Sequence, residues 1–172
     1  MPQFKIEQLA LAITPAREAE AMKFLAACGI KDWTTDMVHA TGVVRGQSCR
    51  NVASLKFNYG AFAGNELELL RYAEGENWLN RIDLPAVSHI GMHIEEEDLA
   101  AWRSVMADFG IPLAQEVWTD SHTNSRIANC RRYHYVIFGT RDLIGVDMKF
   151  IVRRIINQTE ENRQLAKIAS AQ

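Results

Sequence analysis

The chain has 172 residues, of which 48% are hydrophobic and 23% are charged, and this is the composition of an ordinary globular protein. Its 19 basic and 21 acidic residues give a formal net charge of −2, which removes the electrostatic reason to expect a nucleic acid as partner. No run of about 18 apolar residues occurs, so no membrane span is expected.

The cysteines and the N-terminal residues both indicate in which cellular compartment the protein is expected. Cys28, Cys49 and Cys130 are odd in number, are too scattered for a disulfide framework and include no CxxC pair. The apolar run near the start is interrupted by Glu7 and Gln8 and lacks a small-residue cleavage site, which argues against a secretory signal. A cytoplasmic protein with reduced thiols is therefore expected.

The chain contains one pattern twice. The segment 8–12 begins 21 residues before Gly29-Ile30. The segment 89–93 likewise begins 21 residues before Gly110-Ile111. The offset between the two copies is 81 residues, close to half of the chain. Each copy passes from an alternating segment to a helical segment and then to three segments of strand character. The sequence therefore predicts two tandem βαβββ modules.

Helix signals mark the same place in each copy. Thr14-Pro15 predicts the start of a helix that ends at Gly29, and Asp98 predicts the cap of a second helix that ends at Gly110. Strands are expected over 33–44, 51–58 and 64–72 in the first copy, and over 113–119, 132–138 and 144–151 in the second.

Turn-forming and polar composition predicts the connections. Residues 42–50 and 119–132 are expected to be loops. The predicted organisation is a first module at 1–75, a linker at 76–87, a second module at 88–151 and a C-terminal helical extension at 152–172.

Strand alternation sorts the polar residues onto one face of the predicted sheet. That face carries Gln8 on the first strand, Glu66 and Glu68 on 64–72, His89 and His93 on the strand that opens the second module, and Asp147 and Lys149 on 144–151. Amide, carboxylate and imidazole groups form a mixed nitrogen and oxygen environment that suits a divalent metal. The alternative is that this face is simply the water-exposed side of an antiparallel sheet.

Duplicated βαβββ modules, with HIGMHI opening the second and NELELLRY closing the first, resemble the vicinal oxygen chelate superfamily. This is the glyoxalase/bleomycin-resistance/extradiol-dioxygenase group, and the resemblance covers roughly residues 4–151. It implies an α+β fold in which the two modules form a curled mixed sheet around a central cavity, with the C-terminal helix outside this core. It also implies a homodimer.

The same resemblance implies a divalent metal ion bound by Gln8, Glu68, His89 and Asp147, without distinguishing Ni, Zn, Co, Mn or Fe. This order of ligands is most like that of glyoxalase I. Asp147 is one methylene shorter than the usual glutamate, and by the strict 81-residue offset it matches Glu66 and not Glu68. Either glutamate is a candidate ligand, and Glu68 is preferred because LELLRY fits the family's strand better. Glu66 and His93 are expected beside the ligands.

A glyoxalase-like, metal-dependent lyase or isomerase is the function that this ligand set implies. It would act on a small substrate with two adjacent oxygens through an enediolate, with Asp147 or Glu68 moving the proton. The alternative is a metal-free, resistance-type protein that binds a small molecule. A ring-cleaving extradiol dioxygenase ranks third, because Gln8 stands where that class needs its first histidine.

Three arginines either bind the anionic end of a substrate or are solvated charges on a loop: Arg126, Arg131 and Arg132. The position of His134 relative to the cavity stays open.

Overall fold

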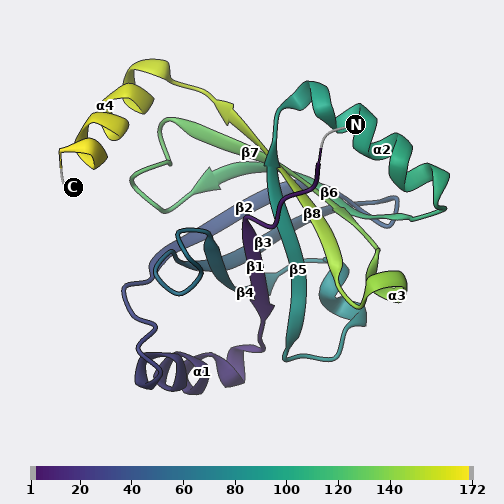
Figure 1. Ribbon diagram of the computed structural model, residues 1–172, viewed down its shortest axis with the longest axis horizontal. Coiled ribbons are helices and arrows are strands. Elements are labelled where there is room, and N and C mark those ends of the chain that lie inside the picture. The colour runs from purple at the N-terminus through teal and green to yellow at the C-terminus, as the bar shows by residue number, and fades with distance from the viewer. Residues whose placement is uncertain (1–2, 171–172) are drawn as a thin grey trace.

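The computed structural model describes residues 3–170, which form eight strands and four α-helices. The strands close into a barrel in the order β1-β4-β3-β2-β6-β7-β8-β5 (Figure 1). The first module contains β1 (Gln8–Ala12), α1 (Pro15–Ala27), β2 (Thr34–Val44), β3 (Gln47–Asn58) and β4 (Glu66–Glu74). The second contains β5 (Ala86–Ile94), α2 (Leu99–Asp108), β6 (Leu113–His122), β7 (Arg131–Phe138), α3 (Arg141–Ile144) and β8 (Asp147–Ile155).

The strand pairing repeats between the modules. β1 pairs in parallel with β4, and β5 pairs in parallel with β8, while antiparallel pairs join β1 to β5 and β2 to β6. Ala10 lies opposite Glu68 in the first parallel pair, and Gly91 lies opposite Lys149 in the second. Each residue of the second pair stands 81 positions after its counterpart in the first. The predicted fold class, with two tandem βαβββ modules in a curled mixed sheet, is therefore confirmed.

One predicted loop is in fact a hairpin. Residues 42–50 were expected to be irregular, but β2 runs to Val44 and β3 begins at Gln47. Arg45 and Gly46 form the whole connection, and both have positive φ angles, of 48° and 79°. Two consecutive left-handed residues match the twist of the flanking strands, so this turn is tight although only its second residue is glycine.

The strand ends of the second module also differ from the prediction. The loop expected at 119–132 is shorter, because β6 continues to His122. β8 begins at Asp147, three residues later than expected, because the short helix α3 and the left-handed Gly145 precede it.

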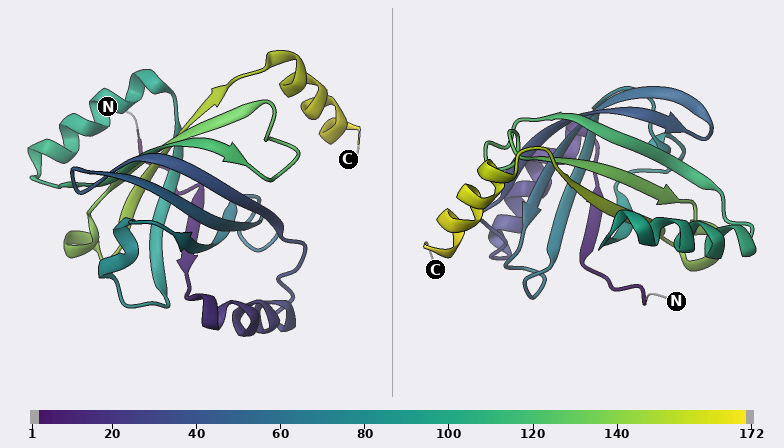
Figure 2. Two further views of the ribbon diagram at one scale, coloured as in Figure 1. Left: turned by 180° about the vertical axis from the view of Figure 1, so that it is seen from behind. Right: turned by 90° about the horizontal axis from the view of Figure 1, so that it is seen from above.

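The predicted C-terminal helix is present, but it begins after residue 152, because residues 152–155 continue the last strand. β8 extends to Ile155, and α4 (Gln158–Ala169) then leads away from the barrel (Figure 2). Residues 171–172 of the predicted extension lie outside the described residues. Among residues 3–170, no helix is long and apolar enough to cross a lipid bilayer.

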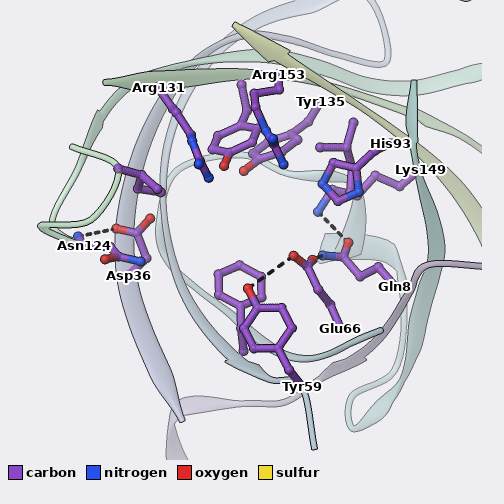
Figure 3. A pocket seen from close by; sticks show the side chains of 14 residues that line it. Gln8, Asp36, Tyr59, Glu66, His93, Asn124, Arg131, Tyr135, Lys149 and Arg153 are labelled. Atoms are coloured by element: carbon purple, nitrogen blue, oxygen red, sulfur yellow. Dashed lines mark hydrogen bonds between the residues drawn. The ribbon is translucent and has the colours of Figure 1, made fainter. Parts of the chain in front are cut away.

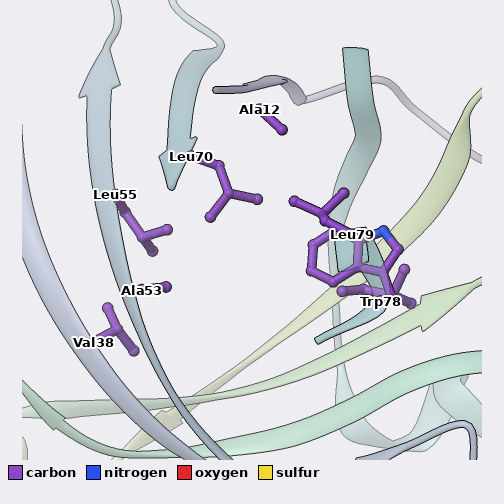
Figure 4. Packing of buried hydrophobic residues seen from close by; sticks show 8 residues of the cluster. Ala12, Val38, Ala53, Leu55, Leu70, Trp78 and Leu79 are labelled. Atoms are coloured by element: carbon purple, nitrogen blue, oxygen red, sulfur yellow. The ribbon is translucent and has the colours of Figure 1, made fainter. Parts of the chain in front are cut away.

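Two apolar cores lie on the two faces of the curled sheet. The inner core fills one end of the barrel around Trp78, from the 3₁₀-helix Trp78–Arg81 (Figure 4). Its other members are Ala12, Val38, Ala53, Leu55, Leu70, Leu79 and Ile137. The outer core packs α2 against β5, β7 and β8 through Met92, Leu99, Trp102, Met106, Val136, Phe138 and Phe150. The outward apolar side chains of β5, β7 and β8 thus pack under α2.

Helix α1 is held differently, because none of its residues is buried. Its link to the sheet is Glu18, which forms ion pairs with Lys56 of β3 and with Arg71 of β4, the second at 2.7 Å. Burial raises the pKa of Glu18, but Lys56 and Arg71 outweigh burial and hold it below the ordinary value of 4.5. The position of α1 therefore depends on charge and less on packing.

Replacing Glu18 by Gln should lower the free energy of unfolding by about 1–2 kcal/mol at pH 7, because two charge-assisted contacts are lost from a partly exposed site. A lowered carboxyl pKa contributes stability that is present above the unfolded-state pKa and is lost as the pH falls through the folded-state value. Urea unfolding should therefore show a smaller difference near pH 4 than at pH 7. The exposed Glu20→Gln variant is the control, and an equal loss of stability at both pH values would contradict the account.

Candidate functional site

Four polar side chains meet inside the barrel, one from each strand of the two parallel pairs. His89 Nε2 lies 2.8 Å from Gln8 Oε1 and 3.7 Å from Glu68 Oε2. Lys149 Nζ lies 3.1 Å from the same Gln8 oxygen and 3.5 Å from Glu68 Oε2. None of the four is more than 5% exposed. We call Gln8, Glu68, His89 and Lys149 the quartet.

The quartet follows from the duplication. His89 stands 81 positions after Gln8, and Lys149 stands 81 positions after Glu68. Because the two parallel strand pairs have the same register, the equivalent residues face each other across the barrel. Space for them comes partly from Gly91, where a Cβ atom would lie 3.1 Å from Gln8 Oε1. The absence of a side chain at Gly91 thus leaves room for that of Gln8.

The hydrogen bonds define the proton positions in the quartet. Gln8 Nε2 donates to Glu66 Oε2 at 2.6 Å, so the amide oxygen of Gln8 faces His89 and Lys149 and accepts from both. The neutral His89 ring therefore carries its proton on Nε2. Its Nδ1 lies 3.1 Å from Ser88 Oγ, and the Ser88 hydroxyl donates to the carbonyl of Ala10 at 3.2 Å.

Burial and charge set the ionisation of the quartet. Burial raises the pKa of Glu68, and the Lys149 ammonium opposes that rise. Burial, followed by the positive charges of Lys149 and Arg141, holds the pKa of His89 well below its ordinary value, so the ring is neutral at pH 7. One oxygen of Glu68, Oε1, is buried and has no hydrogen-bond partner among the described residues. Lys149 is therefore the positive charge that faces the Glu68 carboxylate.

Asp147, the fourth predicted metal ligand, lies in a different environment. Its carboxylate accepts from the backbone N–H and from Nε of Arg141, both at 3.2 Å. Burial raises the pKa of Asp147, and Arg141 opposes the rise. It lines a hollow at the other end of the barrel, together with Arg45 and Trp78. The structure thus brings Gln8, Glu68 and His89 together and pairs Asp147 with an arginine.

Glu66 and His93, which were expected beside the ligands, both line the cavity that adjoins the quartet. Glu66 accepts the hydrogen bond from Gln8 described above and lies 3.4 Å from the hydroxyl of Tyr59. His93 Nδ1 lies 3.3 Å from Glu7 Oε2. Glu66 thus orients a quartet residue directly, whereas His93 forms part of the cavity wall.

The cavity next to the quartet has a volume of about 250 Å³ and opens where β2 begins and β8 ends (Figure 3). We call it the mouth cavity. Lys149 and Gln8 line its inner end, and Arg131 and Arg153 point into it from β7 and β8 (Figure 3). Aromatic rings form much of the wall: Phe57, Tyr59, Tyr133 and Tyr135. A curled sheet around a cavity, implied by the family resemblance, is therefore present.

The remaining polar candidates separate by position. Arg131 lines the mouth cavity while its guanidinium binds Glu161 of α4 at 2.6 and 2.7 Å. Arg132 donates to backbone carbonyls, and Arg126 is exposed on the loop before β7. His134 lies on the outer face of the barrel and stacks on Trp118, with ring centroids 4.4 Å apart.

Lys149 is the site residue that the sequence analysis did not single out. Strand alternation placed it on the correct face, and the 81-residue offset pairs it with Glu68. Lysine is not a usual metal ligand, so the ligand position on this strand was assigned to Asp147 and not to Lys149.

The side chains of the quartet do not suit a divalent metal as they lie. The ammonium of Lys149 occupies the space beside the oxygens of Gln8 and Glu68, and a second cation there would be repelled. The other carboxylate of the predicted set, that of Asp147, is engaged by Arg141. In residues 3–170, no group of three or more His, Cys, Asp or Glu side chains is arranged to hold a metal ion. The predicted metal role of the four residues stays a prediction.

Comparison with solved structures identifies the architecture. No protein-family model matches the sequence, and no curated protein matches it. A triple mutant of 4-hydroxymandelate synthase from Streptomyces coelicolor, a vicinal oxygen chelate protein, matches 89% of this chain with a TM-score of 0.54 and 12% sequence identity. The chain has the vicinal oxygen chelate fold. It spans half the length of that synthase, because the match covers 50% of the synthase chain.

Other vicinal oxygen chelate proteins match at a lower structural similarity. Methylmalonyl-CoA epimerase from Streptomyces coelicolor has a TM-score of 0.45 and 17% identity, over 88% of this chain and 98% of its own. The Mycobacterium tuberculosis epimerase has a TM-score of 0.43 and 11% identity, over 88% and 92% of the two chains. One vicinal oxygen chelate scaffold hosts several reactions, so the side chains of this chain have to carry the functional argument.

Proposed function

We propose that this chain binds a small organic anion in the mouth cavity, which would make it a metal-free, small-molecule-binding protein. The observation that carries the proposal is the placement of Lys149 and Arg153 in one small cavity. The two carboxylates that also line the cavity already have protein partners. Asp36 accepts from His122 and from two backbone N–H groups, and Glu66 accepts from Gln8. Among the basic residues of the cavity, Arg153 is the one that forms no ion pair within residues 3–170, so its charge is available to a ligand.

Lys149 is suited to hold the anionic end of the ligand. An ammonium group has three N–H donors, and those of Lys149 that meet Gln8 and Glu68 account for two. The third would be free for a ligand on the side where Lys149 lines the cavity. The ring of Tyr135 lies beneath the ammonium, 4.4 Å from Nζ, and fixes its position. A ligand carboxylate would thus accept a charge-assisted hydrogen bond away from bulk water.

The aromatic wall favours a flat ligand. Tyr133 and Tyr135 stack on each other with ring centroids 5.7 Å apart and planes 10° apart, and Phe57 and Tyr59 lie across the cavity. A volume of about 250 Å³ is below the range of roughly 300–1,000 Å³ for typical ligand pockets, so the ligand has to be small. The ligand class that fits is a small carboxylate with an aromatic or unsaturated body.

Benzoate and phenylpyruvate should bind with dissociation constants of about 1 mM or tighter, and their methyl esters should bind at least about 10-fold more weakly, because the anionic end is lost. Arg153→Gln should weaken carboxylate binding about 3–10-fold, whereas Arg17→Gln, on the exposed face of α1, should leave it unchanged. NMR titration measures the affinity and reports which residues shift.

Two results would contradict the proposal. In the first, no carboxylate of this class shifts the resonances of the mouth cavity. In the second, the esters bind as tightly as the acids, which would indicate an apolar ligand and not an anionic one.

A glyoxalase-like, metal-dependent lyase is the second candidate. It is favoured by the meeting of Gln8, Glu68 and His89 and by the oxygen of Glu68 that lacks a partner. Turnover of methylglyoxal with glutathione, together with about one divalent ion per chain that is lost in His89→Ala, would support it. Folded, metal-free protein without turnover would count against it. The homodimer and the cytoplasmic location stay predictions.

A further inference from the structure

The quartet contains its own cation. The ammonium of Lys149 approaches the same two oxygens, Gln8 Oε1 and Glu68 Oε2, that lie nearest to His89 Nε2. These are the donor atoms that a metal ion would need. The position beside them is therefore taken by a side chain that the chain supplies itself.

We infer that Lys149 replaces a divalent metal in this barrel, and that residue 149 decides which cation the quartet holds. The inference goes beyond anion binding in the mouth cavity, because it concerns the cation and holds whatever the ligand is. Two observations carry it: the equivalence of Lys149 and Glu68, and the charge balance around them.

The equivalence of positions 68 and 149 in the two modules predicts where another side chain at position 149 would lie. Glu68 and Lys149 occupy the same place in the two parallel strand pairs, and their side chains reach each other across the barrel axis. A glutamate side chain extending from position 149 would therefore approach the centre as Glu68 does. The inward set would then contain an amide oxygen, an imidazole nitrogen and two carboxylates, which is a set of ligands for a divalent ion.

The charge balance explains why the native chain would exclude a metal. Gln8 is an uncharged amide, and the ammonium of Lys149 lies 3.5 Å from Glu68, the one carboxylate of the quartet. The adjoining carboxylate of Glu66 accepts the amide N–H of Gln8. The next carboxylate along β8, Asp147, is neutralised by Arg141. A dication entering the quartet would meet one carboxylate and one ammonium. Its electrostatic attraction to the carboxylate would be largely cancelled by its repulsion from the ammonium.

Titration of the purified chain with Co²⁺ or Zn²⁺, after dialysis against a chelator, tests the inference. The wild type should bind no ion at the quartet. Lys149→Glu should bind one equivalent at least about 100-fold more tightly than the wild type, and its melting temperature should rise when the metal is added. Calorimetry measures the affinity, and the visible spectrum of Co²⁺ reports the coordination.

Lys149→Met keeps the experiment decisive if Lys149→Glu folds poorly. Methionine removes the ammonium without adding a ligand, so this variant should bind metal more weakly than Lys149→Glu but more tightly than the wild type. Adding His89→Ala to Lys149→Glu should abolish binding, whereas adding His39→Ala, an exposed histidine of β2, should not.

Two results would overturn the inference. One is a wild type that binds an equivalent of metal as tightly as Lys149→Glu and loses it in His89→Ala. The other is a folded Lys149→Met variant with no gain in metal affinity over the wild type. Neither result depends on whether carboxylates bind in the mouth cavity, so a failure of the anion-binding proposal remains distinguishable.

Discussion

A buried ion pair between Lys149 and Glu68 is the interaction on which the interior of this barrel depends. Removing two charges from water is costly, and the cost is offset only when each charge keeps close partners. Lys149 has Gln8 and the ring of Tyr135 in addition to Glu68. These partners exist only in one register of the two parallel strand pairs, so the pair also specifies how the modules close on each other.

The ion pair also divides the barrel interior. On one side, Trp78 packs against its apolar neighbours in the inner core. On the other side, small residues and aromatic walls leave a cavity that opens to solvent. The side chain of Lys149 is at this boundary, where it is almost completely buried and still lines the cavity. An apolar core thus lies on one side of this pair of charges, and the mouth cavity lies on the other.

The two modules, their helices and the polar inward face could be predicted because each depends on short-range patterns: the 81-residue offset, strand alternation and helix caps. Other features do not follow from these patterns. The turn at Arg45-Gly46 has only one glycine among its two left-handed residues. Asp147 pairs with Arg141 across the short helix α3, and Arg131 pairs with Glu161 because of where α4 lies. The choice between Asp147 and Lys149 therefore required the three-dimensional register.

A double-mutant cycle on Lys149→Met and Glu68→Gln tests the central claim most directly. Each single change should lower the free energy of unfolding by about 3–5 kcal/mol, because it leaves one buried polar partner without its counter-charge. The double variant should recover at least about 2 kcal/mol of the summed loss, since both charges are then absent. Strictly additive losses, measured by urea unfolding at pH 7, would show that the two side chains do not interact and would contradict the account.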